Sequence, residues 1–240
     1  DEFSEWGAKI SQWAADYHTT LRERPVRAQT EPGDVAALIA PSAPEGPHAM
    51  SEIMEDFERV VMPGITHWQH PRFFAYFPAN AAPPSMLAEM LVSTIAAQCM
   101  LWQTSPAATE METVMLDWLR QAIGLPNKFS GVIQDTASSA TLVAVLTMRE
   151  RALKWNGNQV GLSGAARLRM YCSEEVHSSV DRAIWIAGIG QENLVRIPIS
   201  GKLRSMNPQL LKEAIQSDIA AGYCPAGIIA CTGGTGTGAC

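Results

Sequence analysis

Three predicted strand-to-helix turns carry the side chains that could do chemistry in this sequence. The first, residues 134–141, reads QDTASSAT and places small hydroxyl side chains at the expected start of a helix. Free backbone N–H groups and the positive end of the helix dipole would favour a phosphate there, and the same residues also suit ordinary helix capping. Both interpretations stay open for this turn taken alone.

The other two turns have a comparable ambiguity. Residues 171–181 contain His177, which could stack on a planar ligand or exchange a proton near neutral pH, or could be structural. Residues 231–240 read CTGGTGTGAC, and such glycines either let the backbone approach a ligand or form a flexible turn. Taken together, the three turns predict one anionic, planar ligand.

An alternation of strands and helices must position these turns. We expect strands at 131–136, 168–172, 194–197 and 227–231, separated by helices at 139–155, 176–187 and 208–221. Strands separated by helices of this length indicate a mostly parallel sheet with helices on its faces. Ligands of such sheets bind at the carboxyl ends of the strands, which is where the three turns fall.

The N-terminal third has a different pattern. An amphipathic helix is predicted from apolar residues at steps of three and four, namely Phe3, Trp6, Ile10, Trp13, Tyr17 and Leu21. This stripe could pack on its own domain or on another subunit. A second helix is expected at 51–61, ended by Pro63-Gly64, and further helices at 84–102 and from Ser105-Pro106 onward, the last with a Thr109/Glu112 capping box.

The segment between these helices, residues 66–82, is rich in aromatic residues and prolines. Its prolines argue against a regular helix. The aromatic side chains could line a core or form the wall of an apolar pocket.

Composition narrows the function classes. A net charge of −6 without a Lys/Arg cluster gives little support to binding of nucleic acid or an anionic membrane. The five cysteines are scattered and odd in number, which is typical of reduced thiols in a cytoplasmic protein. The histidines show no metal-binding spacing, and neither a P-loop nor a nucleophile-elbow motif occurs. Residues 86–102 are too interrupted by polar residues to predict a membrane span.

Four long segments resemble the group II pyridoxal-phosphate-dependent decarboxylases, especially the aromatic-L-amino-acid branch, which includes histidine, tyrosine and tryptophan decarboxylases. They are MPGITHWQHPRFFAYFP (Met62–Pro78), WQTSPAATEMETVMLDWL (Trp102–Leu119), GVIQDTASSATLVAVL (Gly131–Leu146) and YCSEEVHSSVDRA (Tyr171–Ala183). The resemblance implies the α/β fold type I of pyridoxal-phosphate-dependent transferases, preceded by a helical dimerisation segment. Residues 1–82 would form that segment with its substrate-pocket loop, and residues 83–240 the first part of the large cofactor-binding domain.

The resemblance also assigns roles to residues. Thr136, Ala137 and Ser138 would bind the phosphate of pyridoxal 5'-phosphate, and Thr235 would lie beside the cofactor. His177 would stack on the pyridine ring and assist catalysis. The substrate pocket would be lined by Trp68, Tyr76, Phe77, Pro78 and Met100, and no metal is implied.

Three departures bear on the substrate. The family's usual GTT is Gly233-Gly234-Thr235 here, Ala79 stands where the aromatic enzymes often have Thr, and Met100 stands where an aromatic residue is common. The apolar wall of Trp68, Tyr76 and Phe77 favours an aromatic amino acid.

The implied activity is decarboxylation of an L-amino acid, with aldehyde synthesis on the same fold or a non-catalytic, lysine-less relative as alternatives. In the family, the cofactor-anchoring lysine and the aspartate that pairs with the pyridine nitrogen come after the position of Cys240. We therefore expect a cytoplasmic homodimer in amino-acid metabolism, in which a companion chain carries the C-terminal part with that lysine.

Overall fold

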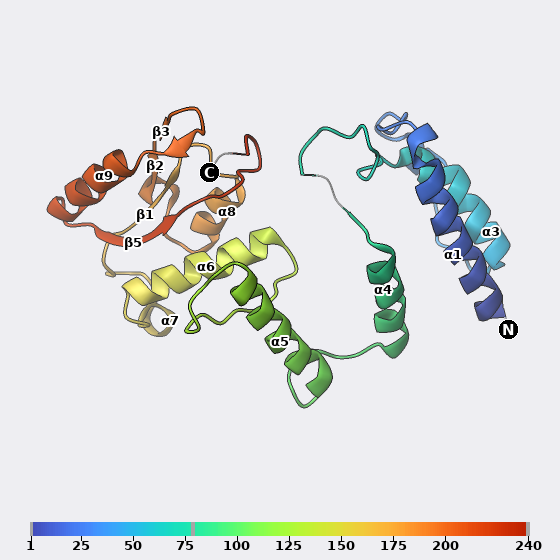
Figure 1. The fold of residues 1–240 in the computed structure, drawn as a ribbon, viewed down its shortest axis with the longest axis horizontal. Coiled ribbons are helices and arrows are strands. Elements are labelled where there is room, and N and C mark those ends of the chain that lie inside the picture. The colour runs from blue at the N-terminus through green and yellow to red at the C-terminus, as the bar shows by residue number, and fades with distance from the viewer. Residues whose placement is uncertain (1, 78–79, 239–240) are drawn as a thin grey trace. The chain divides into compact units, whose positions relative to one another are not determined.

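The computed structural model describes residues 2–77 and 80–238, and the chain forms two compact units, Asp1–Ile95 and Ala96–Cys240. Figure 1 shows the helical first unit and the second unit with its sheet. The compact units meet between Ile95 and Ala96, after the predicted domain boundary at 82/83, and helix α4 therefore groups with the first unit.

The first unit consists of helices and a long connecting loop. Its helices are α1 (Glu2–Thr20), α2 (Asp34–Ala37), α3 (Met50–Asp56) and α4 (Pro83–Ile95), with short turns η1 (Leu21–Glu23), η2 (Phe57–Val61) and η3 (Met62–Gly64). The expected helix at 51–61 is α-helical only to Asp56 and continues as a π-helical turn. No regular helix forms in the described part of segment 66–82, as its prolines predict.

The aromatic stripe of α1 is used in two ways. Trp13 stacks on Tyr17 with ring centroids 5.4 Å apart, and it meets Phe57 edge-on at 5.2 Å, which attaches α1 to the segment after α3. Phe3 and Ile10 remain 69% and 45% exposed. One end of the stripe therefore packs within its own unit, and the other end is more exposed.

The second unit contains the predicted α/β alternation. Its helices are α5 (Pro106–Ala122), α6 (Ala137–Ala152), α7 (Gly157–Val160), α8 (Ser179–Ile186) and α9 (Pro208–Ala220), with a short turn η4 (Gln191–Asn193). Its strands are β1 (Leu168–Ser173), β2 (Leu194–Ile197), β3 (Ile199–Ser200), β4 (Ser205–Met206) and β5 (Cys224–Ile229). Strands β2, β1 and β5 form a parallel sheet in that order, and β3 pairs with β4 as an antiparallel hairpin.

The core of the second unit lies around the central strand β1. Met170 and Cys172 of β1, Ile184 of α8 and Val145 of α6 are completely buried, as expected for a parallel strand that is covered on both faces. A methyl group at Gly227 of β5 would come within 2.2 Å of Met148 Sδ, so this glycine lets α6 lie close to the sheet.

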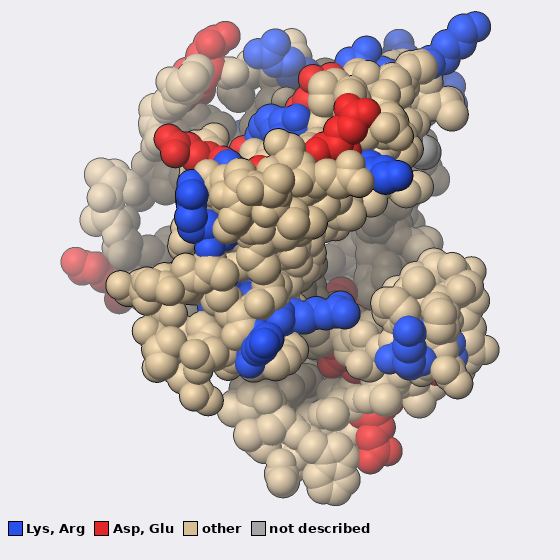
Figure 2. Space-filling model, turned by 90° about the vertical axis from the view of Figure 1, so that its left-hand side faces the viewer, with Lys and Arg blue, Asp and Glu red and all other residues tan. Residues whose placement is uncertain are grey.

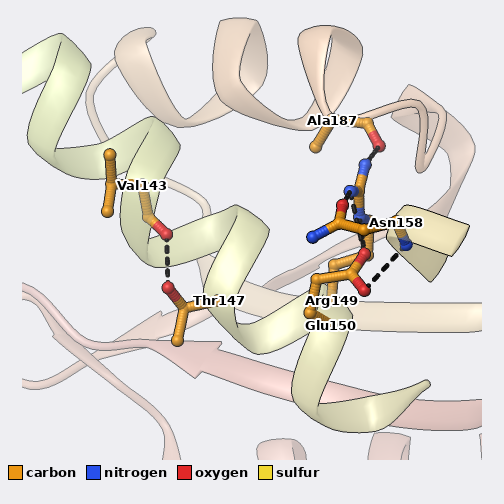
Figure 3. A network of polar contacts seen from close by, with 6 residues as sticks. All are labelled: Val143, Thr147, Arg149, Glu150, Asn158 and Ala187. Carbon is orange, nitrogen blue, oxygen red and sulfur yellow. Dashed lines mark hydrogen bonds and ion pairs between the residues drawn. The ribbon is translucent and has the colours of Figure 1, made fainter. Parts of the chain in front are cut away.

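A polar network holds the C-terminal end of α6 (Figure 3). Arg149 donates to the Ala187 carbonyl at 2.8 Å and to Asn158 Oδ1 at 3.2 Å, and it pairs with Glu150 at 2.9 Å. Glu150 is only 3% exposed and accepts the Asn158 backbone N–H at 3.1 Å. The buried carboxylate is thus both ion-paired and hydrogen-bonded, which its burial requires.

Three local predictions differ from the structure. The helix expected at 84–102 ends seven residues early, at Ile95. Residues 131–136 do not form a strand, because the Ile133 N–H is taken by Glu112 Oε1 at 2.7 Å and not by a neighbouring strand. The same contact removes the predicted capping box, since Glu112 points to Ile133 and the Thr109 hydroxyl donates to the Ser105 carbonyl at 3.2 Å. Ser105 does precede α5, although its side chain makes no capping bond.

The surface shows no single-sign charge patch on the face drawn in Figure 2, where Lys/Arg and Asp/Glu side chains are interspersed among uncharged residues. Within the described residues, no helix combines the length and the apolar character needed to cross a membrane. The four described cysteines, Cys99, Cys172, Cys224 and Cys231, are free thiols.

Candidate functional site

The start of α6 has the geometry of an anion site. Thr136 is the N-cap, and its Oγ1 accepts the Ser139 N–H at 3.1 Å while its carbonyl accepts the Ala140 N–H at 3.0 Å. The N–H groups of Ala137 and Ser138 belong to the first helical turn, which has no intrahelical acceptor for them. They lie at the positive end of a 16-residue helix, where a negative charge is favoured.

Asp135 shows that this helix start stabilises an anion. The Ser139 hydroxyl, followed by the backbone N–H groups of Thr136 and Asp135, holds the pKa of the Asp135 carboxyl below its ordinary value. The ionised form of the Asp135 carboxyl is therefore favoured at the start of α6, where the N–H groups of Ala137 and Ser138 also belong. These donors fit the phosphate of pyridoxal phosphate.

His177 follows β1 in a turn that fixes the orientation of its ring. Nδ1 of His177 accepts the Ser179 N–H at 3.1 Å and lies 3.0 Å from the Ser179 hydroxyl. A backbone N–H only donates, so Nδ1 carries no proton and the neutral ring has its proton on Nε2. The ring is exposed. Sequence reasoning missed this role of Ser179. The signal that could have revealed it is the presence of a hydroxyl residue two positions after the histidine.

Two glutamates attach the His177 turn to neighbouring strands. The Glu174 N–H donates to the Ile197 carbonyl at the end of β2, and its carboxylate accepts the Ile199 N–H, each at 3.1 Å. Glu175 pairs with Arg204 of the β3–β4 hairpin, with Nε at 2.9 Å from Oε2. The turn is therefore fixed on both sides of the point where it leaves β1.

The Gly/Thr turn after β5 lies against the His177 turn. The Thr237 hydroxyl is 3.4 Å from Glu175 Oε2, and a cavity of about 180 Å³ separates the two turns, lined by Ser173, Glu175, Arg204, Ile229, Gly234 and Thr237 among others. Thr235 is an exposed residue of this turn. Because β1 and β5 are parallel, both turns leave the same edge of the sheet.

Figure 1 shows that α6 begins on the side of the sheet at which β5 ends. Helix α6 also packs on both β5 and α8. The three predicted turns thus belong to one edge, which we call the carboxyl edge and define as residues 135–139, 174–179 and 230–238.

The predicted substrate residues belong to a different part of the chain. In the first unit, Trp68 stacks on Phe73 at 4.9 Å and on Tyr76 at 5.5 Å between ring centroids. Tyr76 has a φ of 54°, a left-handed conformation that costs a non-glycine residue about 1–3 kcal/mol and that clusters at ligand sites. We call residues 66–77 the aromatic loop.

The remaining substrate predictions are less constrained by the structure. Phe77 is 56% exposed at the end of the aromatic loop. Pro78 and Ala79 lie outside the described residues. Met100 is 72% exposed in the second unit, in the connection between α4 and α5. Contact of these residues with a substrate stays a prediction.

The fold and the carboxyl edge are those of a protein that binds a phosphorylated, planar cofactor. The family described as pyridoxal-dependent decarboxylase conserved domain matches residues 32–240. The chain therefore belongs to the pyridoxal-dependent decarboxylase family, which confirms the resemblance and its cofactor, pyridoxal phosphate.

Individual relatives agree with this membership. Aromatic-L-amino-acid decarboxylase of Mus musculus is 40% identical over 98% of this chain and 50% of its own length, and phenylacetaldehyde synthase of Arabidopsis thaliana is 36% identical over 94% and 46%. The crystal structure of Catharanthus roseus tryptophan decarboxylase in complex with L-tryptophan superposes with a TM-score of 0.92, at 34% identity, over 99% of this chain and 52% of that one. The predicted fold type is confirmed, and the chain spans about half the length of the curated relatives it matches.

Proposed function

We propose that the protein decarboxylates an aromatic L-amino acid to the amine and carbon dioxide. The observation that carries this proposal is the carboxyl edge, where a helix start that stabilises an anion accompanies an imidazole of fixed orientation. The named activities of the mouse and Catharanthus relatives support the aromatic substrate.

In this proposal each part of the carboxyl edge has its own task. The N–H groups of Ala137 and Ser138, with Thr136, hold the cofactor phosphate, and Thr235 lies beside the cofactor. When bound, pyridoxal phosphate supplies an electron-withdrawing ring that accepts the electrons released as the carboxylate leaves. His177 supports the face of that ring and, through Nε2–H, presents a proton at the reacting side.

The aromatic loop would provide the substrate wall. The stacked rings of Trp68, Phe73 and Tyr76 offer a flat apolar surface to an aromatic side chain. Phe77, Pro78 and Met100 complete the wall in the proposal.

The assembly is part of the same proposal. We infer a cytoplasmic homodimer with the cofactor-anchoring lysine on the C-terminal part of the protein, supplied by a companion chain if that part is separate. Exposed apolar residues on α1, α4 and α5 support an assembly that covers these helices; they include Phe3, Leu87, Leu91, Met111 and Trp118.

Aldehyde synthesis is the second candidate, favoured by the 36% identity to the Arabidopsis phenylacetaldehyde synthase. Both candidates are tested by supplying the full-length protein with pyridoxal phosphate and L-tryptophan, L-tyrosine or L-phenylalanine. A decarboxylase gives carbon dioxide and the amine, whereas an aldehyde synthase consumes dioxygen and water and gives carbon dioxide, the aldehyde, ammonia and hydrogen peroxide. Cofactor binding without either product would identify a non-catalytic relative and overturn both proposals.

A further inference from the structure

Two buried histidines lie on either side of Trp68 in the aromatic loop. His67 and His70 are each 3% exposed, whereas Trp68 is 40% exposed. Burial of two imidazoles requires hydrogen-bond partners for their ring nitrogens, and the structure supplies them from the N-terminal segment and from the loop itself.

His67 attaches the loop to α1 and to the segment after it. Its Nδ1 lies 2.8 Å from the Tyr17 hydroxyl, and its backbone N–H donates to the Val26 carbonyl at 2.9 Å. Burial, together with the nearby Arg24 and His70, keeps the pKa of His67 below its ordinary value, so its ring is neutral near pH 7.

The contacts of His70 determine its tautomer. Its Nδ1 accepts the Arg72 backbone N–H at 2.9 Å, so this nitrogen carries no proton. Nε2 therefore holds the proton and donates to the Arg22 carbonyl at 3.3 Å. The neutral Nε2–H form satisfies both contacts, one inside the loop and one to the η1 turn after α1.

These two contacts lie where the aromatic loop turns. The His70 N–H donates to the His67 carbonyl at 3.0 Å, and the Phe73 N–H donates to the His70 carbonyl at 2.9 Å. The two turns bring Phe73 back against Trp68. The orientation of the stacked rings therefore depends on a side chain that is itself hidden from any ligand.

We propose that His70 is a positioning residue, which holds the aromatic wall of Trp68, Phe73 and Tyr76 in place and thereby sets the affinity for aromatic substrates. The proposal rests on the proposed function, because it assigns this wall to the substrate. His70 itself touches neither substrate nor cofactor in this role.

The test compares two variants of the full-length protein. His70→Leu keeps apolar bulk and loses both hydrogen bonds. His70→Asn can restore the bond to the Arg72 N–H, because an asparagine oxygen accepts readily from the N–H two residues later. His48→Leu is the matched control, since His48 is an exposed histidine of the same unit whose Nδ1 lies 3.1 Å from Glu52 Oε2, away from the aromatic loop in sequence.

The first measurement is hydrogen–deuterium exchange of peptides covering 66–77. We expect faster exchange, by about tenfold at the most affected amides, in His70→Leu. Protection should be largely restored in His70→Asn and unchanged in His48→Leu, with peptides covering 168–184 unaffected throughout. Equal exchange of 66–77 in His70→Leu and wild type would overturn the positioning role, and this measurement does not depend on any enzymatic activity.

The second measurement separates positioning from general damage. For an aromatic amino acid, His70→Leu should raise KM about tenfold with kcat within about threefold and with unchanged affinity for pyridoxal phosphate. An unchanged KM, or an equal loss of kcat for every substrate, would reduce His70 to a structural residue and overturn the proposal. A wild-type protein inactive on all amino acids would instead overturn the proposed function, while the exchange data would still decide whether His70 positions the loop.

Discussion

The carboxyl edge and the aromatic loop are held in place by different kinds of contact. The carboxyl edge is made of turns between regular strands and helices, and the residues assigned to the cofactor (Thr136, Ala137, Ser138, His177 and Thr235) are exposed on it. The aromatic loop has no regular structure, and two buried histidines support its exposed rings. In the proposed function, the chemistry lies on the part that secondary structure fixes, and the selectivity lies on a loop that a few side chains fix.

The largest expected effect tests the rigid support of the carboxyl edge. Glu150→Ala leaves the Arg149 guanidinium and the Asn158 N–H without their buried partner. We expect a loss of about 3–5 kcal/mol in the free energy of unfolding, measured by urea denaturation of the full-length protein. The control Arg151→Ala, at an exposed position of the same helix, should change it by less than about 0.5 kcal/mol. Similar values for both variants would show that the network does not support α6.

The next prediction separates cofactor binding from stability at the start of α6. Ser138→Asp adds a negative charge to the first helical turn, which favours the helix by about 0.3–1 kcal/mol but repels a phosphate. We expect the affinity for pyridoxal phosphate, followed by absorbance titration, to fall by about 10- to 100-fold without a loss of stability. Ser138→Ala, which keeps the backbone N–H, should lose much less affinity. An unchanged affinity of Ser138→Asp for pyridoxal phosphate would show that the phosphate does not bind at this helix start.

The two regions also differ in how much of them the sequence predicts. The alternation of apolar runs and helical periods is a local property, so strands β1 and β2 and helices α5 and α9 could be placed to within about two residues. Strand pairing is not local, which is why 131–136 could be mistaken for a strand although Glu112 takes its N–H. The strand–helix alternation pointed to the three turns, and the resemblance assigned roles to Trp68 and Tyr76.

Side-chain partners distant in sequence could not be predicted. Nothing local couples His67 to Tyr17, 50 positions earlier, or Arg204 to Glu175, 29 positions earlier. By contrast, the contacts of His177 with Ser179 and of His70 with Arg72 are local, each made to a donor two residues after the histidine.

A third prediction concerns the core beneath the carboxyl edge. Tyr171 of β1 is completely buried, and its hydroxyl donates to Asp218 of α9 at 2.9 Å. Tyr171→Phe should lower the free energy of unfolding by about 1–2 kcal/mol at pH 7, since Asp218 loses a buried donor.

Burial, followed by Asp218, raises the pKa of Tyr171 well above its ordinary value. The wild type should therefore lose stability as the pH rises above about 10, where the unfolded chain ionises first, and the difference from Tyr171→Phe should shrink there. A pH-independent difference in urea denaturation between pH 7 and 11 would contradict this account.

The smallest effect is expected in the aromatic loop, at the opposite end of the pH scale. The pKa of His67 is lowered mainly by burial, then by Arg24 and His70, so the folded loop binds fewer protons than the unfolded chain as the pH falls. The stability that neutral His67 contributes is complete above about pH 6.5 and is lost as the pH falls through its lowered pKa. Hydrogen exchange of residues 66–77 should therefore accelerate under mild acid, after correction for the intrinsic rate, before that of residues 168–184. His67→Gln, which stays neutral, should remove most of this acid dependence. Simultaneous loosening of both segments in the wild type would mean that the loop and the sheet respond to acid as one unit, and the contrast between the two regions would fail.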